Sequence, residues 1–225
     1  MKSKLVLSAA LGLALASPAP AALFSTNWSS GFVNGTIIPD GNLSGWSDTR
    51  TLAGLDGTIG DISVTLSLAN GWNGDLYAYL THGSGFTVLL NRVGTPGLTY
   101  GYADTGFAIT LSDAGTPGLH NYQSGPYSLN GNGQLTGTWQ PDGVGFAAGG
   151  FVGLDPNGTW TLFIVDYETE GVTLVSSWGL DMTLVPIPEV ETWIAAALAG
   201  LFGACWVNRQ VWRGVKPNSG GESKA

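Results

Sequence analysis

Apolar and polar residues alternate with a period of two through the middle of the chain. In 62–68 and again in 178–184 every second residue is apolar, and the residues between them are Ser, Thr, Gly or Asp. Successive side chains of a strand point to opposite faces of the sheet, so this pattern predicts strands with one buried and one solvated face. Further short segments bounded by Gly, Asn, Asp or Pro are also predicted strands: 76–80, 86–91, 107–111 and 160–165.

No stretch of twelve or more residues in this middle part has helical spacing. Short strands separated by Gly-rich turns predict an all-β fold, an antiparallel β-sandwich or jelly roll. The segment 112–151 is the least regular, because Asn and Gln alternate there with Gly. Two interpretations stay open for it: a long loop that carries a binding function, or an edge region of weak strands.

The first residues have the three parts of a secretory signal. Lys2 and Lys4 form the positive start, an apolar stretch too short to span a membrane follows, and Ala19-Pro20-Ala21 is a small-residue cleavage site. We therefore expect residues 1–22 to be a signal peptide and residues 23–185 to be the exported domain. A buried N-terminal helix is the alternative. The exported part contains no Cys, so its stability has to come from packing or bound ligands.

A second apolar segment runs from Trp193 to Val207 and is followed by Arg209, Arg213 and Lys216. Fifteen helical residues cover about 22 Å of a hydrocarbon core of roughly 30 Å, so the segment is short for a permanent anchor. The basic residues after it predict that the tail 215–225 faces the cytoplasm and that residues 23–187 lie outside it. We expect a short transmembrane helix within 186–214.

A Pro-Glu pair, the apolar segment and the basic cluster follow one another in this tail. That order resembles the PEP-CTERM sorting signals of bacterial exported proteins. The resemblance puts Pro188 and Glu189 on the first two motif positions, whereas Val190 stands where a second Pro is expected. It implies export by the Sec machinery, recognition by the membrane enzyme exosortase, and release or re-anchoring at the cell surface or in an extracellular matrix. An ordinary C-terminal anchor is the alternative.

Charge excludes one class of partner. Residues 23–187 carry thirteen Asp and Glu against two Arg, a net charge of −11. So acidic a surface repels phosphate backbones, and nucleic-acid binding through a basic footprint is excluded. The aromatic content, 11% of the chain, is that of a folded domain rather than a solvated coil.

Several pieces of residues 36–184 together resemble the P domain (P/Homo B domain) of proprotein convertases and bacterial subtilisin-like proteases. In chain order they are Ile38-Pro39-Asp40, Gly74-Asp75-Leu76, Val88-Leu89-Leu90-Asn91-Arg92, Gly158-Thr159-Trp160-Thr161-Leu162 with Asp166, and Thr173-Leu174 with Ser177-Trp178-Gly179-Leu180. The resemblance implies a galactose-binding-like β-sandwich that supports folding and stability, while catalysis belongs to a separate protease domain. From the residues alone, Asp40 and Asp75 stand where a carboxylate accepts hydrogen bonds from turn N–H groups.

Candidate catalytic residues are few. His82 is followed two positions later by Ser84, a spacing that does not by itself bring imidazole to hydroxyl. We therefore expect a non-enzymatic structural or interaction module. An accessory domain of a protease system is a distant alternative.

Two binding sites are conceivable on the exported domain. Asp166, Glu168 and Glu170 alternate along a loop, as ligands of calcium do, although a solvated acidic turn explains them equally. Trp139 stands among polar residues, where an exposed ring would stack on a sugar, and a polysaccharide-binding module is the second functional hypothesis.

Overall fold

The computed structural model describes residues 20–94, 99–187, 198 and 201–202. The predicted signal segment up to residue 19 and the sorting residues Pro188, Glu189, Trp193, Val207, Arg209 and Arg213 lie outside the described residues. Leu198, Leu201 and Phe202 are helical and exposed. Among the residues described, no helix has both the length and the apolar character needed to cross a membrane.

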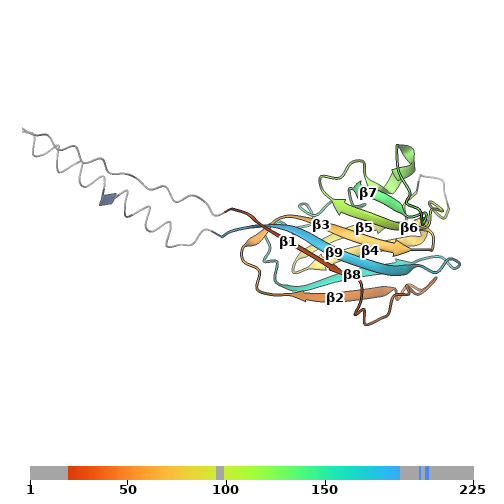
Figure 1. Cartoon of the computed structure of the whole chain (residues 1–225), viewed down its shortest axis with the longest axis horizontal. Coiled ribbons are helices and arrows are strands. Elements are labelled where there is room, and N and C mark those ends of the chain that lie inside the picture. Colours follow the sequence, from red (N-terminus) through yellow and green to blue (C-terminus); the bar gives the residue numbers. More distant parts are fainter. Residues whose placement is uncertain (1–19, 95–98, 188–197, 199–200, 203–225) are drawn as a thin grey trace, which may run out of the picture. The chain divides into compact units, whose positions relative to one another are not determined.

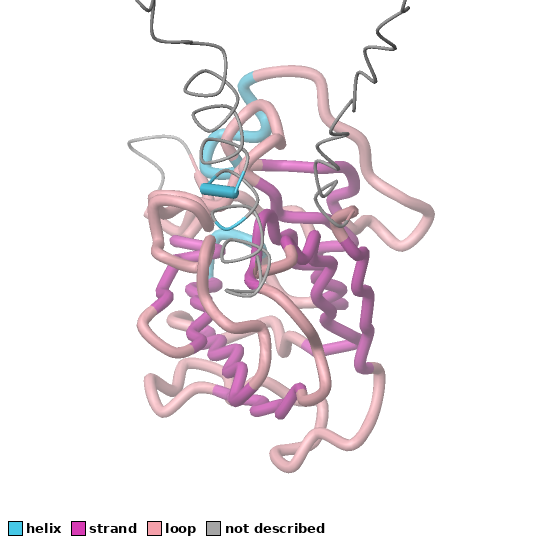
Figure 2. The backbone as a smooth tube through the Cα atoms, turned by 90° about the vertical axis from the view of Figure 1, so that its left-hand side faces the viewer, coloured by secondary structure: helices cyan, strands magenta, loops and turns pink. Residues whose placement is uncertain are grey.

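Nine strands form the framework of the domain between Pro20 and Pro186, as far as its residues are described. They are β1 (Ala22–Trp28), β2 (Trp46–Leu52), β3 (Thr58–Ala69), β4 (Leu76–His82), β5 (Gly85–Asn91), β6 (Gly106–Ser112), β7 (Leu135–Trp139), β8 (Gly158–Asp166) and β9 (Leu174–Val185). Two short 3₁₀ turns, η1 (Asn73–Asp75) and η2 (Leu119–Ser124), complete the regular structure (Figure 2).

The strands form two sheets, and every pair but one is antiparallel. The first sheet has the order β1-β9-β3-β6-β7 and the second β2-β8-β4-β5 (Figure 1). The exception is β7, which pairs parallel to β6 at the edge of the first sheet. Ala22 pairs with Leu184, so the chain enters β1 and leaves β9 at the same end of the sheet.

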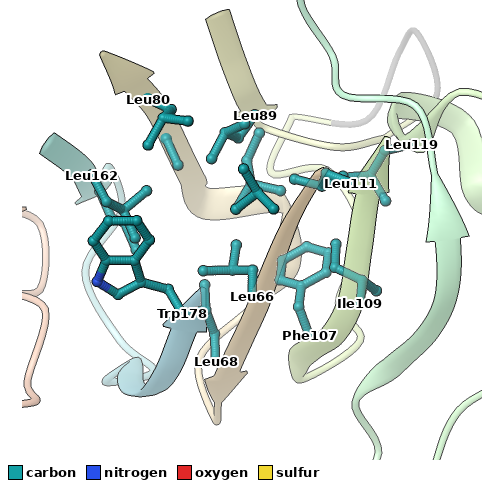
Figure 3. Packing of buried hydrophobic residues seen from close by; sticks show 14 of the residues in the cluster. Leu66, Leu68, Leu80, Leu89, Phe107, Ile109, Leu111, Leu119, Leu162 and Trp178 are labelled. Carbon is teal, nitrogen blue, oxygen red and sulfur yellow. The ribbon is translucent and has the colours of Figure 1, made fainter. Parts of the chain in front are cut away.

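The inner faces of the two sheets pack against each other through apolar side chains. Leu66, Leu68 and Phe107 of the first sheet face Leu80 and Leu162 of the second (Figure 3). Three Trp side chains are fully buried in this core, at positions 46, 160 and 178. The alternation noted in the sequence is the alternation between this core and solvent.

All six predicted strands are confirmed, and so is the all-β, mainly antiparallel sandwich. β1, β2 and β7 were not predicted. β1 begins at Ala22, the last residue of the predicted signal segment. The irregular segment 112–151 contains η2 and the short edge strand β7, which matches the interpretation as an edge region of weak structure.

Candidate functional site

Acidic side chains from three distant parts of the chain gather where β8 ends and β4 begins. Asp40, Asp75, Asp166 and Glu168, which we call the acidic cluster, act electrostatically on one another there. The backbone ties their segments together: the N–H of Ile38 donates to the carbonyl of Thr173 at 3.0 Å, and the N–H of Glu170 donates to Oδ2 of Asp40 at 3.1 Å.

Asp75 is held by its own backbone and by the preceding glycine. It ends η1, and its carbonyl accepts the N–H of Tyr167 at 2.9 Å, which places it beside the end of β8. The N–H of Gly74 donates to the carbonyl of Tyr102 at 2.9 Å, and a Cβ at Gly74 would overlap the carbonyl oxygen of Tyr100. Glycine is therefore required for the close approach that buries Asp75.

Asp166 is the last residue of β8 and pairs with Leu76, so it lies next to Asp75 across the strand pair. Its Oδ2 accepts the hydroxyl of Thr173, which is also fully buried, at 3.1 Å. Gly71, at φ 62°, leaves room for that hydroxyl, because a Cβ there would overlap Oγ1 of Thr173. One oxygen of Asp166 is thus fixed by the protein itself.

Four carboxylate oxygens of this cluster are buried without a hydrogen-bond partner among the described residues. Asp75 and Asp166 are both 0% exposed, and the unpartnered atoms are both oxygens of Asp75, Oδ1 of Asp166 and Oδ1 of Asp40. A desolvated carboxylate favours its neutral form. Burial, followed by the charge of Asp166, raises the pKa of Asp75 to about 6. Burial and the charge of Asp40 raise the pKa of Asp166 to about 6 as well, against the opposing hydrogen bond from Thr173.

The structure corrects the set of three acidic residues predicted as calcium ligands. Asp166 is buried, but Glu168 forms an ion pair with Arg92 at 2.6 Å and Glu170 is exposed. Within the described part of the chain no three His, Cys, Asp or Glu side chains form a ready group for a metal ion. The alternation in the sequence could not show that Arg92, from a distant strand end, pairs with Glu168.

The prediction for Asp75 also needs correction. Its carboxylate caps no turn, since both of its oxygens are unpartnered, whereas Asp40 does accept a turn N–H. Sequence reasoning missed the proximity of Asp75 to Asp166. The one signal that could have found it is that both residues lie in the ordered pieces resembling a P domain.

Trp139 does not offer a platform for a sugar ring. It is 4% exposed, its indole N–H donates to the carbonyl of Thr136 at 2.9 Å, and its ring packs edge-on against Tyr122. The polar neighbours in the sequence misled the prediction because β7 turns this side chain into the core. Trp46 is also buried, while Trp72 is 37% exposed.

Exposed or half-buried aromatic rings instead follow one another from the end of β8 to β5. The ring centroids are 6.4 Å apart between Tyr167 and Tyr77, 6.3 Å between Tyr77 and Tyr79, and 5.4 Å between Tyr79 and Phe86. Phe163 stacks on Tyr79 at 4.9 Å. We call these five residues the aromatic row. Tyr77, Tyr79, Phe86 and Phe163 occupy strand positions that alternate with core residues, so they belong to the outer side of the second sheet, and Tyr167 follows the end of β8.

His82 is used structurally. Its ring lies parallel to Trp160 at 3.9 Å, and its nitrogens approach the carbonyl oxygens of Thr159 at 2.9 Å and Asp155 at 2.7 Å. The side chain is 5% exposed. A general base needs a free nitrogen facing the proton that it removes, and both nitrogens of His82 are engaged by backbone carbonyls instead.

No family model matches this chain, and no curated protein matches it significantly. Two solved structures resemble it distantly. The crystal structure of Aeromonas sobria serine protease in complex with its chaperone aligns with 17% identity and a TM-score of 0.45, over 76% of this chain and 28% of that chain. The crystal structure of the Aeromonas sobria serine protease aligns with 15% identity and a TM-score of 0.44, over 74% of this chain and 27% of that chain. The chain thus spans less than a third of the length of either structure.

Proposed function

We propose that this protein is a non-enzymatic exported module of the cell surface or extracellular matrix, built on a P-domain-like sandwich and sorted through its C-terminal segment. The observation that carries the proposal is the pairing of Ala22 with Leu184. Because this pair lies at one end of the first sheet, the chain enters and leaves the described domain at the same end. Chain ends that lie together at one edge of a domain suit attachment through a terminal segment, because the rest of the domain then stays accessible.

The P-domain resemblance gains support from the way its pieces meet. The Ile38-Pro39-Asp40 piece hydrogen-bonds to residues of 170–173, and Asp166 accepts from Thr173. Asp75 adjoins the end of β8 through the N–H of Tyr167. Pieces up to 130 positions apart in the sequence therefore form one structural unit.

The absence of catalysis is proposed on two grounds. Both ring nitrogens of His82 are held by carbonyl oxygens, and the imidazole is stacked on Trp160. His120, the other histidine, approaches Asp142 at 3.5 Å, and Asp142 also accepts the backbone N–H of Asn91. Steady cleavage of casein by the purified protein, lost in His82→Ala, would contradict this part of the proposal.

Sorting is tested by fractionating native cells and determining both ends of the mature chain by mass spectrometry. We expect an N-terminus near residue 22, and a C-terminus near Pro188 if exosortase processes the tail. The variant Glu189→Ala should retain the tail in the membrane fraction, and Pro186→Ala, which changes a proline outside the motif positions, should behave as wild type. An intact tail to Ala225 in mature protein would make the chain a simple anchored protein.

The aromatic row favours a second function, binding to extracellular polysaccharide. Phe86 is 46% exposed and Tyr167 is 42% exposed. Aromatic rings that are partly open to solvent offer apolar faces on which sugar rings stack, although cross-strand aromatic pairs also stabilise sheets by themselves. Affinity electrophoresis in soluble polysaccharides separates the two roles. Retardation abolished by Tyr79→Ala and kept by Tyr100→Ala, a substitution of an exposed tyrosine outside the row, would support binding.

A further inference from the structure

The carboxylate of Asp75 is buried and has no hydrogen-bond partner among the described residues. Both of its oxygens are unpartnered although the residue is 0% exposed, and Oδ1 of the equally buried Asp166 is unpartnered too. Leaving a buried charged group unsatisfied is costly, so native proteins pair such groups or use them to coordinate metal ions. These oxygens therefore need a hydrogen-bond donor or a cation that comes from outside the chain.

We propose that the acidic cluster is a calcium site, with Asp75 and Asp166 as its fixed carboxylate ligands and Asp40 as a third ligand. All three residues contribute an unpartnered oxygen, and the charge of Asp40 lies close enough to raise the pKa values of both Asp75 and Asp166. The site thereby joins the segment after Ile38, the turn before β4 and the end of β8.

The local charge calls for a cation. The acidic cluster contains four carboxylates, and the cation that acts on it, Arg92, is paired with Glu168 at 2.6 Å and also donates to the carbonyl of Gly74 at 3.4 Å. Arg92 therefore neutralises the outer part of the cluster. The negative charges of Asp75, Asp166 and Asp40 remain without a compensating cation among the described residues. A divalent ion between these three would offset most of that remaining charge.

The chemistry of the donors selects the kind of ion. The available atoms are carboxylate oxygens from irregular segments, which suits calcium, because it accepts six to eight oxygen ligands in flexible geometry. No three acidic side chains among the described residues are already gathered into a coordination shell, so the preformed part is the Asp75–Asp166 pair. Asp40, backbone carbonyls and water would complete the shell. Binding then adds a cross-link between three segments in a domain that contains no Cys.

The test measures thermal unfolding of the full chain in detergent, in chelator and in about 10 mM calcium, with ionic strength matched by NaCl. We expect calcium to raise the Tm of the wild-type protein by about 5 °C. Asp75→Asn and Asp166→Asn should each weaken calcium binding at least about tenfold. Isothermal titration calorimetry measures this affinity. Asp61→Asn, which neutralises an exposed carboxylate on β3, should leave the shift intact.

Terbium binding keeps the proposal testable if Asp75→Asn fails to fold. Terbium should bind the wild-type chain and be displaced by calcium. The variant Asp40→Asn, at the edge of the cluster, should weaken the binding of both ions. The proposal is overturned if calcium produces no shift beyond that of NaCl. It is equally overturned if Asp75→Asn and Asp166→Asn retain the wild-type response.

Discussion

Two buried carboxylates in this domain are treated in opposite ways. Asp48 on β2 is 3% exposed, and its Oδ2 accepts the indole N–H of Trp178 at 2.7 Å and the guanidinium of Arg50 at 2.6 Å. Asp75 at the start of β4 is fully buried, and both of its oxygens lack a partner. Each carboxylate lies beside the apolar core, so burial alone does not distinguish them.

The difference between Asp48 and Asp75 depends on which carboxylates the two Arg side chains of this region contact. Arg50 is committed to Asp48 and also lies over the rings of Trp28 and Phe32, at 5.5 Å and 5.3 Å. Arg92 is committed to Glu168. These are the two Arg residues available to thirteen carboxylates between positions 23 and 187. The region around Asp48 is therefore complete within the protein, whereas the acidic cluster depends on a group supplied by solvent.

The largest effect is expected at Asp48. Asp48→Ala leaves the buried indole N–H of Trp178 and the charge of Arg50 without their acceptor, which should cost about 3 kcal/mol of unfolding free energy. Chemical denaturation followed by Trp fluorescence measures this loss, and it should be the same in calcium and in chelator. A loss that calcium restores would contradict the separation of the two regions.

The pH dependence of the metal-free protein should have the opposite sign to ordinary acid denaturation. Because burial raises the pKa values of Asp75 and Asp166 from 3.8 to about 6, the folded state binds more protons than the unfolded state between these values. Stability from these groups is therefore lost as pH rises from about 4 to about 6, by up to about 3 kcal/mol for each group. Tm scans in chelator measure the slope, and Asp75→Asn combined with Asp166→Asn should flatten it.

Replacing Asp75 alone should stabilise the protein in chelator. Asp75→Asn removes a buried charge that has no partner, so we expect a gain of about 2 kcal/mol at neutral pH. In saturating calcium the gain should disappear, because the wild-type protein is then stabilised by the ion. Urea denaturation under both conditions measures the reversal. Equal destabilisation under both would show that Asp75 has a partner within the chain.

The smallest effect is expected at Thr173. Thr173→Val keeps the shape of the side chain and removes the hydroxyl that donates to Asp166, which should cost about 1 kcal/mol. The loss of this donor should also raise the pKa of Asp166 further, and so extend the pH-dependent range upward. Thr159→Val, which changes an exposed threonine on β8, is the matched control. Unchanged stability of Thr173→Val relative to this control would remove Thr173 from the cluster.

Strand prediction succeeded where one face of a strand is apolar. β3 and β9 alternate over their central residues, and both lie in the middle of the first sheet. β2 escaped prediction because its sequence Trp-Ser-Asp-Thr-Arg-Thr-Leu places a charged residue, Asp48, on the buried face. β7 is short and contains Gly137, and it gains its partner only by pairing with β6.

The candidate site was only partly predictable. The carboxylates of the 166–170 loop were visible as a local pattern, and Asp166 is indeed buried beside another carboxylate. The neighbour that matters, Asp75, lies 91 positions earlier, and no local period connects them. The prediction for Trp139 was wrong because it expected an exposed ring. Polar neighbours in the sequence do not show whether an edge strand points a side chain to the core or to solvent.

By itself, the sequence determined the all-β class, the six strands whose alternation reflects one buried face, and the excess of carboxylates over Arg. These properties follow from local periodicity and composition. The tertiary structure decided which carboxylates receive the two guanidinium groups, which rings face the core, and that Asp75 lies beside Asp166 where β4 pairs with β8. Such choices depend on sheet order and register, because contacts between distant segments arise only when the strands that carry them are paired.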